Sequence, residues 1–209
     1  ASKPKVGDAR TSIEKVVSLK PDLVLAHAFV NDDAIPKLET LGITVFAVDP
    51  KTPAEVARDI RTIGKITARP KTAESVAKSL ETAVAGVKSN RAKRSSKNVL
   101  VVIQANPLWA AGPETFVDEM VRLANGKNVA FDCRPGFNPF SKELALKRNP
   151  DVIIAGTNDD AAYFLKSPLW RHTKAVKNKR VYVIDPDTLV RPGPRLAIGL
   201  KEIASKLDY

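Results

Sequence analysis

Few side chains in this sequence could carry out chemistry, and they are not spaced as a catalytic set. The chain has two histidines, His27 and His172, and one cysteine, Cys133. These are too few for a Cys/His zinc site, and a lone cysteine cannot form an internal disulfide. We find no glycine-rich phosphate loop and no Ser-His-Asp set in a suitable context. The sequence therefore favours a binding protein over an enzyme, with no catalytic residue and no cofactor.

Two pairs of adjacent acids are the remaining candidates for metal binding. Asp32 with Asp33, and Asp159 with Asp160, could supply oxygen ligands to a cation. Acids that stand next to each other before a helix more often cap that helix. We therefore predict helix caps at both pairs and no metal site, and we interpret Cys133 as a buried structural thiol.

Aromatic and polar side chains in the loops after predicted strands are the best candidates for ligand contact. In α/β sheets, ligands collect beyond the carboxyl ends of the strands. Aromatic rings and amides there suit a flat or bulky ligand, and an arginine suits an anion or a carboxamide. A structural histidine, core aromatics and ordinary surface charges are the alternatives. The predicted ligand-binding residues are His27, Phe29, Asn106, Trp109, Phe137 and Arg191.

The elements that would position these residues follow an internal repeat. The segment 12–26, Ser-Ile-Glu-Lys-Val-Val-Ser-Leu-Lys-Pro-Asp-Leu-Val-Leu-Ala, aligns without a gap with the segment 141–155. In both copies Ser can cap a short helix, Glu lies near its positive end, and Pro-Asp ends it before an aliphatic strand. A second strand that ends in Asp-Pro follows each copy, at 44–50 and at 180–186. This pattern predicts an α/β fold of two lobes with mainly parallel sheets covered by helices.

Between Pro53 and about Arg91, the spacing of apolar residues predicts helix rather than strand. Val56, Ile60, Ile63 and Ile66 recur at helical intervals, and a similar series follows Pro70. We predict one long helix, kinked or broken at Pro70, that joins the lobes. The predicted divisions are 1–52 for the N-terminal lobe, 53–97 for the connecting helix and linker, and 98–209 for the C-terminal lobe.

Three further elements are predicted in the C-terminal lobe. A run of aliphatic residues indicates a strand at 99–103, and amphipathic spacing indicates a helix at 113–124. Asn125-Gly126 would close that helix. A final helix is predicted at 195–207, after the turn fixed by Pro192 and Pro194.

The composition is that of a folded chain with excess positive charge. Of 209 residues, 44% are apolar, and 34 Lys and Arg against 23 Asp and Glu give a net charge of +11. We therefore expect a folded globular chain rather than a disordered or fibrous one. The positive balance could serve nucleic acid, an acidic membrane surface, an anionic ligand or solubility alone. The densest basic cluster lacks interleaved aromatic rings, so we interpret it as a solvated helix end and expect no nucleic-acid partner. It comprises Lys88, Arg91, Lys93, Arg94 and Lys97.

In this order, the motifs resemble the substrate-binding proteins of ABC importers for cobalamin, ferric siderophores and haem. The resemblance covers nearly the whole chain and rests on the repeat, the connector and three further motifs. Those motifs are Leu41-Gly-Ile-Thr-Val leading to Asp49, Ala175-Val-Lys-Asn-Lys-Arg-Val-Tyr-Val-Ile-Asp, and Arg191-Pro-Gly-Pro-Arg. The resemblance implies two lobes bridged by one helix, little hinge motion, a periplasmic or extracellular membrane-anchored location, and delivery of the ligand to a membrane permease.

The resemblance also implies a role for the two repeated glutamates. In cobalamin-binding members of the family, one Glu on each lobe docks onto arginines of the permease, and these positions match Glu14 and Glu143. A docking role fits two equivalent lobes on a two-fold symmetric permease. The structural alternative is a glutamate favoured by the dipole at a helix start.

The sequence departs from the family at its start. Family members have a strand and a helix before the segment that matches Pro4-Lys-Val-Gly7, so we expect the first lobe to be truncated. The sheet edge left exposed could pair with a second copy in a homodimer. Cobalamin is the leading ligand, and a ferric siderophore or haem is the runner-up. A truncated, non-transporting interaction or scavenging module is a second class of function, and a binder of nucleic acid or an acidic surface is a third.

Overall fold

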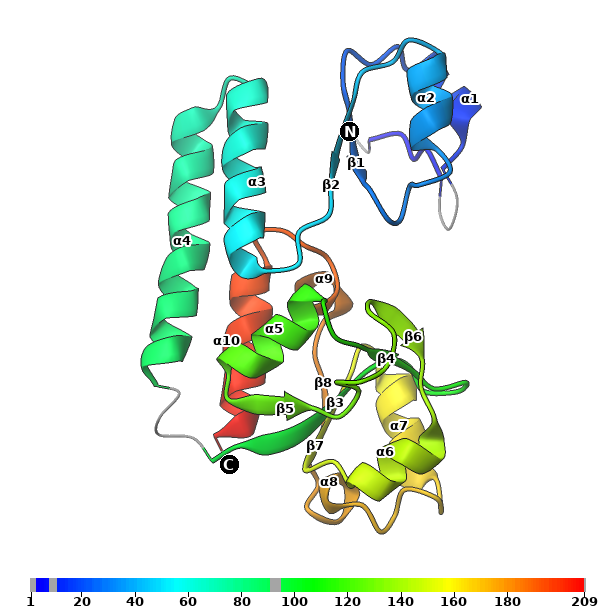
Figure 1. The fold of residues 1–209 in the computed structure, drawn as a ribbon, viewed down its shortest axis with the longest axis vertical. Helices are drawn as coiled ribbons and strands as arrows, with labels where there is room; N and C mark the ends of the chain where they lie inside the picture. Colours follow the sequence, from blue (N-terminus) through cyan, green and yellow to red (C-terminus); the bar gives the residue numbers. More distant parts are fainter. Residues whose placement is uncertain (1–2, 8–10, 91–94, 209) are drawn as a thin grey trace. The chain divides into compact units, whose positions relative to one another are not determined.

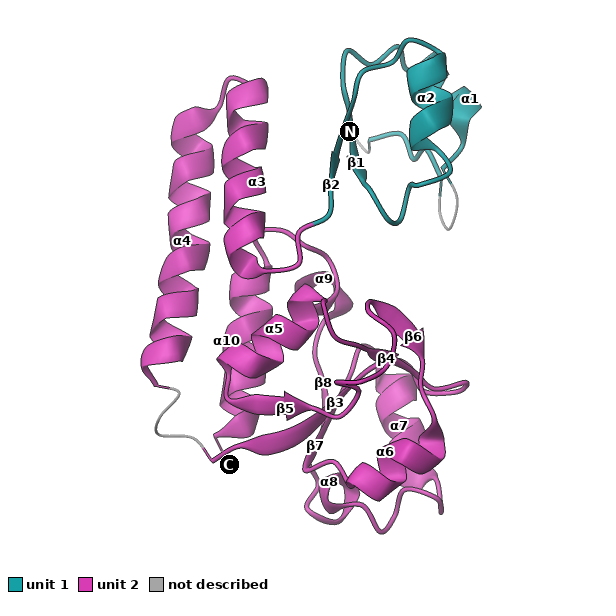
Figure 2. Cartoon of the chain, in the orientation of Figure 1, with its two compact units in different colours: residues 1–49 teal, residues 50–209 magenta. Residues whose placement is uncertain are grey.

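The computed structural model describes residues 3–7, 11–90 and 95–208. The chain divides into two compact units, Ala1–Asp49 and Pro50–Tyr209, which Figure 2 shows in different colours. Arg91, Lys93 and Arg94 of the predicted basic cluster lie outside the described residues. None of the helices within these ranges combines the length and the apolar character that crossing a bilayer requires.

The first unit is a small α/β unit with two parallel strands. Each strand follows a short helix (Figure 1). Val24 lies opposite Val45, and His27 lies opposite Val48, so both strands end side by side. The elements are α1 (Ile13–Ser18), β1 (Val24–His27), α2 (Ile35–Thr40) and β2 (Val45–Val48).

The second unit is built on one mixed sheet. Among the described residues, six strands form this sheet in the order β6-β4-β3-β7-β8, with β5 paired to β3. Strand β3 is parallel to β5 and β7, and β7 is parallel to β8, whereas β4 is antiparallel to β3 and β6. The elements of this unit are α3 (Pro53–Ile66), α4 (Pro70–Ser89), β3 (Lys97–Gln104), β4 (Trp109–Ala111), α5 (Phe116–Leu123), β5 (Gly126–Asn128), β6 (Phe137–Pro139), α6 (Lys142–Arg148), β7 (Val152–Ala155), α7 (Asn158–Lys166), α8 (Lys174–Lys177), β8 (Val181–Val183), α9 (Pro186–Leu189) and α10 (Leu196–Leu207).

Helices cover both faces of this sheet, as predicted. Successive side chains of a strand point to opposite faces, so Val99 and Val101 of β3 enter one core and Leu100 and Val102 enter the other. The first core is closed by α3, α4, α5 and α10, and the second by α6, α7 and α8. All four β3 side chains are at most 1% exposed. A strand buried on both faces is a rigid base for the loops at its carboxyl end.

The prediction of one long connecting helix is wrong. Two helices, α3 and α4, lie side by side and run in opposite directions (Figure 1). The predicted break at Pro70 is confirmed, because α3 ends at Ile66 and α4 begins at Pro70. Pro70 cannot donate an i→i−4 hydrogen bond, and Ala68 has φ 54°, outside the helical region, so the chain reverses there. Both helices belong to the second unit.

A close approach and an ion-pair cluster hold this hairpin together. Gly64 on α3 faces Ala73 on α4 so closely that a Cβ at position 64 would lie 2.1 Å from the Ala73 Cβ. Arg61 on α3 pairs with two acids of α4, Glu74 at 2.7 Å and Glu81 at 2.6 Å. Their hydrogen bonds to Arg61 lower the pKa of both carboxyls and raise that of the guanidinium.

The internal repeat is confirmed element by element. Ser12 caps α1 by accepting a hydrogen bond from the Lys15 amide, and Ser141 caps α6 by accepting one from the Leu144 amide. Strand β1 follows α1 and pairs in parallel with β2, and strand β7 follows α6 and pairs in parallel with β8. Each unit therefore contains the same helix, strand and parallel partner strand.

The remaining predicted elements of the second unit are confirmed, with boundaries shifted by one to three residues. The predicted helix at 113–124 begins at Phe116, because Glu114 has φ 58° and Thr115 provides the cap. Asn125 follows its end with φ 68°, as a helix terminator does. The strand at 99–103 lies within β3, and the final helix spans Leu196–Leu207.

Candidate functional site

In the first unit, His27 and Phe29 lie where β1 ends. The His27 amide donates to Asn31 Oδ1 at 2.9 Å, and its Nε2 lies 3.8 Å from Asp49 Oδ1. Asn31 in turn donates to Thr11 Oγ1 at 3.3 Å. Phe29 follows in a turn and is 69% exposed. His27 is thus positioned by neighbours within its unit, whereas Phe29 presents its ring to solvent.

In the second unit, Trp109 lies beyond the carboxyl end of β3. It opens β4, opposite Gln104 of β3 and Pro139 of β6. Trp109 is 36% exposed, while Ala110 and Ala111 after it are fully buried. The buried part of β4 fixes the strand, so the indole is held at the sheet end on a rigid support.

The turn before Trp109 carries Asn106 and is tied to helix α6. Lys142 Nζ donates to Asn106 Oδ1 at 2.8 Å and to the Tyr163 hydroxyl at 3.1 Å. Gln104 Nε2 donates to the Asn106 carbonyl at 3.1 Å. The structure therefore brings Asn106 and Trp109 together on one turn, as the sequence predicts, and adds Lys142, which sequence reasoning missed.

Asp160 is a second residue that holds this turn. Its Oδ1 accepts from the Ala105 amide at 2.7 Å, and its Oδ2 accepts from Thr157 Oγ1 at 2.6 Å. Thr157 is the N-cap of α7 and accepts from the Asp160 amide. The Thr-x-x-Asp spacing signals a capping box in the sequence, but the bond to Ala105 has no local signal.

The predicted helix caps at the two acid pairs need correction. Asp159 and Asp160 lie in the first turn of α7 rather than at its N-cap. Helix α2 has Ala34 at its N-cap, with no side-chain cap bond. Asp33 instead lies 3.9 Å from Lys37, one helical turn along. No group of three or more potential metal ligands occurs in the described part of the chain.

Phe137 and Arg191 both have partners within the second unit. Phe137 pairs across the strands with Ala111 and meets the Phe116 ring edge to face, with 6.3 Å between centroids. Arg191 Nε lies 2.9 Å from one carboxylate oxygen of Asp187. Arg195 takes the other oxygen at 3.0 Å, so one carboxylate serves two guanidinium groups.

Cys133 is a partly buried thiol. Burial, followed by the nearby Asp132 charge, raises its pKa. Its Sγ lies 3.3 Å from the Arg134 carbonyl oxygen. The raised pKa favours the protonated, unreactive form of the thiol, whereas its burial is only partial and not complete as predicted.

The two repeated glutamates have matching surroundings. Ser12 Oγ donates to Glu14 Oε2 at 3.1 Å, and Ser141 Oγ donates to Glu143 Oε2 at 2.8 Å. Backbone hydrogen bonds first, and then these hydroxyls, lower the pKa of both carboxyls. Both glutamates are exposed, and within the described ranges neither forms an ion pair shorter than 4 Å. Each unit therefore presents one ionised carboxylate at the start of a repeat helix.

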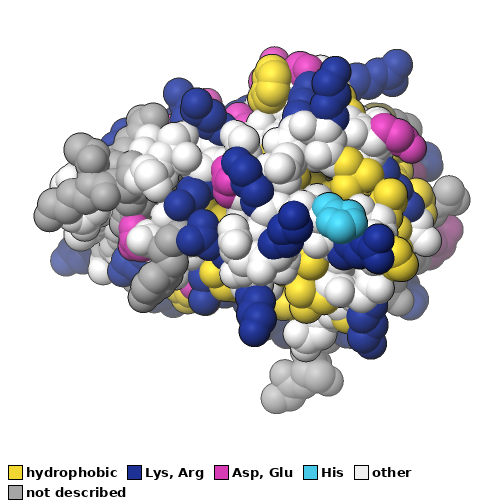
Figure 3. Space-filling model, turned by 90° about the horizontal axis from the view of Figure 1, so that it is seen from below, with side chains coloured by type: hydrophobic (Ala, Val, Ile, Leu, Met, Phe, Trp, Pro, Cys, Tyr) yellow, Lys and Arg dark blue, Asp and Glu magenta, His cyan; other side chains and the backbone are white. Residues whose placement is uncertain are grey.

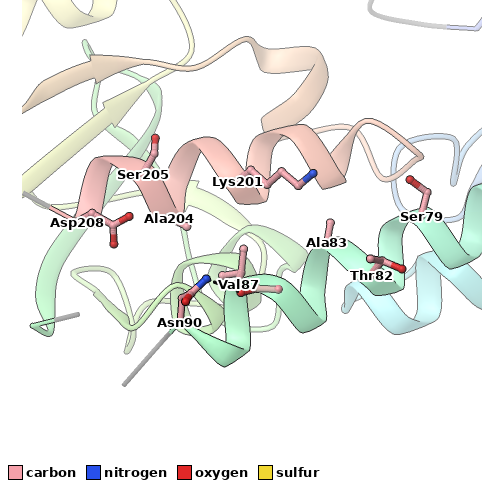
Figure 4. A pocket seen from close by; sticks show the side chains of 10 residues that line it. Ser79, Thr82, Ala83, Val87, Asn90, Lys201, Ala204, Ser205 and Asp208 are labelled. Carbon is pink, nitrogen blue, oxygen red and sulfur yellow. Dashed lines mark hydrogen bonds between the residues drawn. The ribbon is translucent and has the colours of Figure 1, made fainter. Parts of the chain in front are cut away.

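Two cavities of the second unit contain none of the predicted ligand residues. A groove of about 690 Å³ runs between α4 and α10 and is lined by small residues such as Ala83 of α4 and Ala204 of α10 (Figure 4). A hollow of about 690 Å³ lies around Asn98, Phe131 and Arg148. The small side chains of the groove are typical of two helices that pack closely, so we assign it no ligand.

Comparison with known proteins agrees with this arrangement. A sequence profile described as periplasmic binding protein matches residues 1–188. The chain is 36% identical to an uncharacterized ABC transporter substrate-binding lipoprotein, YvrC, of Bacillus subtilis (strain 168), over 97% of this chain and 67% of that protein. It is 28% identical to a vitamin B12-binding protein of Salmonella typhi, over 94% of this chain and 73% of that protein.

A solved structure shows the same fold. The periplasmic vitamin B12 binding protein BtuF of Vibrio cholerae superposes with a TM-score of 0.87 at 24% identity, over 97% of this chain and 80% of that one. The profile match covers most of the chain and the fold agrees with it. The chain therefore belongs to the periplasmic binding protein family.

Proposed function

We propose that this chain is the substrate-binding component of an ABC importer and acts outside the cytoplasm. The names of its relatives, a substrate-binding lipoprotein and a vitamin B12-binding protein, support this role. In this role the chain carries a ligand and hands it to a membrane permease, with no chemical step of its own.

The observation that carries the proposal is the pair of matching Ser-Glu helix starts. A glutamate kept exposed and ionised on each unit can meet arginines on a two-fold symmetric partner at two equivalent points. A hydrogen bond between an ionised carboxylate and an arginine is shorter and stronger than a hydrogen bond between neutral groups. We propose that Glu14 and Glu143 dock onto the permease.

The proposed ligand is cobalamin or a similarly large molecule. Phe29 in the first unit and Trp109 in the second are exposed aromatic rings near the carboxyl ends of β1 and β3. Such rings provide flat apolar contact surfaces at little conformational cost. Asn106 next to Trp109 adds a polar contact, and we propose lesser contributions from His27, Phe137 and Arg191.

The docking role is tested with a double variant, Glu14→Gln with Glu143→Gln. We expect ligand affinity to stay within a few fold, and binding to the permease in detergent or nanodiscs, together with uptake, to be lost. The matched control is Glu39→Gln with Glu114→Gln, which removes the same charge at other exposed sites. Normal permease binding by the Glu14/Glu143 variant would reject the docking role.

The ligand is tested by titration with cyanocobalamin, haemin and a ferric siderophore. Trp109 is 36% exposed, whereas Trp170 is fully buried, so Trp109 should dominate the fluorescence quenching. We expect quenching by cyanocobalamin to persist in Trp170→Phe and to vanish, with the affinity, in Trp109→Leu. Stronger binding of haemin or the siderophore would change the ligand assignment. A lack of response to all three would favour the non-transporting interaction module.

A further inference from the structure

One segment of the second unit carries only positive charge. Residues 161–184 contain no Asp or Glu, although the whole chain has 23 of them. The segment comprises the end of α7, a turn, helix α8 and strand β8. Helix α8 and the turns on either side of it lie at the edge of the sheet where the parallel strands β7 and β8 begin. We call its charged surface the basic face: Lys166, Arg171, Lys174, Lys177, Lys179 and Arg180.

The basic face is held in shape by short hydrogen bonds and one buried anchor. Trp170 is fully buried and packs against Phe164 with 4.6 Å between ring centroids. Its carbonyl accepts from the Thr173 amide at 2.9 Å and from the Thr173 hydroxyl at 2.7 Å. The Arg180 amide closes the next turn onto the Ala175 carbonyl at 2.7 Å. The charged side chains therefore project from a fixed backbone.

Little of this charge is neutralised within the unit. Asp151 lies 3.2 Å from Lys174, and its second oxygen accepts from the Asn98 amide. Among the residues that the structure describes, Lys166, Arg171, Lys177 and Lys179 have no carboxylate within 4 Å. Figure 3 views the chain from the end where α8 lies in Figure 1, and there Lys and Arg outnumber Asp and Glu, with apolar side chains between them.

Exposed apolar side chains stand within the same segment. Leu165 is 51% exposed and Leu169 is 49% exposed, and Pro168 between them is exposed as well. Lys166 follows the first leucine, and Arg171 comes two residues after the second. Apolar side chains flanked by cations suit an interface where hydrocarbon lies beneath anionic headgroups. A soluble polyanion would use the cations but not the leucines.

We propose that the basic face binds the surface of an anionic phospholipid bilayer, with Leu165 and Leu169 inserted between headgroups. Six cations within one segment fall in the range at which basic clusters recognise anionic lipid. The anchored turn limits the entropy lost on binding, because its side chains are already oriented.

The basic face and Glu143 lie at opposite ends of α6. Lys142 at the start of α6 contacts the Asn106 turn, and Asn149 after its end accepts from the Lys174 amide at 2.9 Å. A bilayer held by the basic face is therefore on the side away from Glu143. Lipid binding and the proposed docking are then alternative orientations on one membrane, and lipid binding does not depend on docking.

The test is cosedimentation of the purified 209-residue chain with vesicles of phosphatidylglycerol and phosphatidylcholine, or of phosphatidylcholine alone. We expect binding only to the anionic vesicles, and its loss as salt rises from about 0.05 M to about 0.5 M, because surface charges are then screened. Lys177→Gln with Lys179→Gln should weaken partitioning about 25-fold, at about fivefold for each lysine. Leu165→Gln with Leu169→Gln should weaken it about tenfold or more.

Matched variants distinguish the effect of the basic face from the effects of net charge and of nonspecific hydrophobic binding. Lys65→Gln with Lys71→Gln removes two exposed lysines from α3 and α4, and Ile198→Gln removes an exposed apolar side chain from α10. Both controls should bind the vesicles within about twofold of the original chain. Polyphosphate in solution serves as the second probe. No binding to anionic vesicles at low salt would overturn the proposal. The proposal would also be overturned if the chain bound polyphosphate tightly and the Leu165→Gln/Leu169→Gln variant bound vesicles as well as the original chain does. That result would indicate that the basic face binds a soluble polyanion.

Discussion

Replacing Gly64 by alanine should push apart the two helices of the α3–α4 hairpin. A Cβ at this position would lie 2.1 Å from the Ala73 Cβ and 3.2 Å from the Arg69 carbonyl oxygen. Ordinary van der Waals contact begins at 3.4 Å. Because the Ala73 methyl has no rotamer by which to move away, the backbones must separate by roughly 1 Å or more.

Two opposing terms set the size of the effect. Overpacking of this kind costs about 1–3 kcal/mol. The higher helix propensity of alanine returns up to about 1 kcal/mol. We therefore expect Gly64→Ala to lower the free energy of unfolding by about 1–2 kcal/mol. For a unit of this size, that loss lowers Tm by about 2–8 °C.

The chain offers a matched control within the same hairpin. Gly86 lies in the interior of α4, and a Cβ there would meet no atom within 4 Å. Gly86→Ala should therefore gain stability by about 0.5–1 kcal/mol, from propensity alone. Urea unfolding followed by tryptophan fluorescence reports this unit, because Trp109 and Trp170 both lie in it.

A compensating change completes the experiment. Ala73→Gly removes the methyl that Gly64→Ala would strike, so the double variant should recover part of the lost stability. The reasoning is refuted if Gly64→Ala stabilises the unit as much as Gly86→Ala does. It also fails if Ala73→Gly brings no relief in the Gly64→Ala background.

Two further predictions concern the candidate site. Asp160→Asn keeps the shape of the side chain but removes the charge that strengthens its hydrogen bond to the Ala105 amide. The free energy of unfolding, measured in urea, should fall by about 1 kcal/mol, and the fluorescence emission of Trp109 should shift. Unchanged emission would mean that Asp160 does not set the conformation of the turn. The pKa values of Glu14 and Glu143 are lowered from the ordinary 4.5, so their charge is present above that value and is lost only as the pH falls through the lower folded pKa. Permease binding should then be constant from pH 8 to about pH 5, and a midpoint above 4.5 would contradict docking through these carboxylates.

The repeat could be predicted from the sequence because each of its parts has a local cause. Ser12 and Ser141 cap helices through their own side chains, and the proline after each helix ends it independently of the tertiary structure. The same local signals identified the break at Pro70. They did not show that the chain turns back there, since helical periodicity on either side of a break contains no information on direction.

The contacts that shape the candidate site had no such signal. Lys142 meets Asn106, and Asp160 meets the Ala105 amide, across long stretches of sequence. Residue types alone could place Asn106 and Trp109 on a turn but could not say what holds it. The basic face was also missed, because its cations are spaced along the segment. The densest group of cations in the sequence lies instead at 88–97.

Lys142 and Glu143 are consecutive residues, and this adjacency would couple docking on the permease to release of the ligand. The first turn of α6 carries Glu143, which is proposed to contact the permease. The same turn carries Lys142, whose Nζ donates a hydrogen bond to Asn106 Oδ1 at 2.8 Å. Any tilt of that turn of helix as Glu143 engages would stretch this bond. Docking through Glu143 would then loosen the Asn106 turn, and with it the proposed ligand contact beside Trp109, within the second unit.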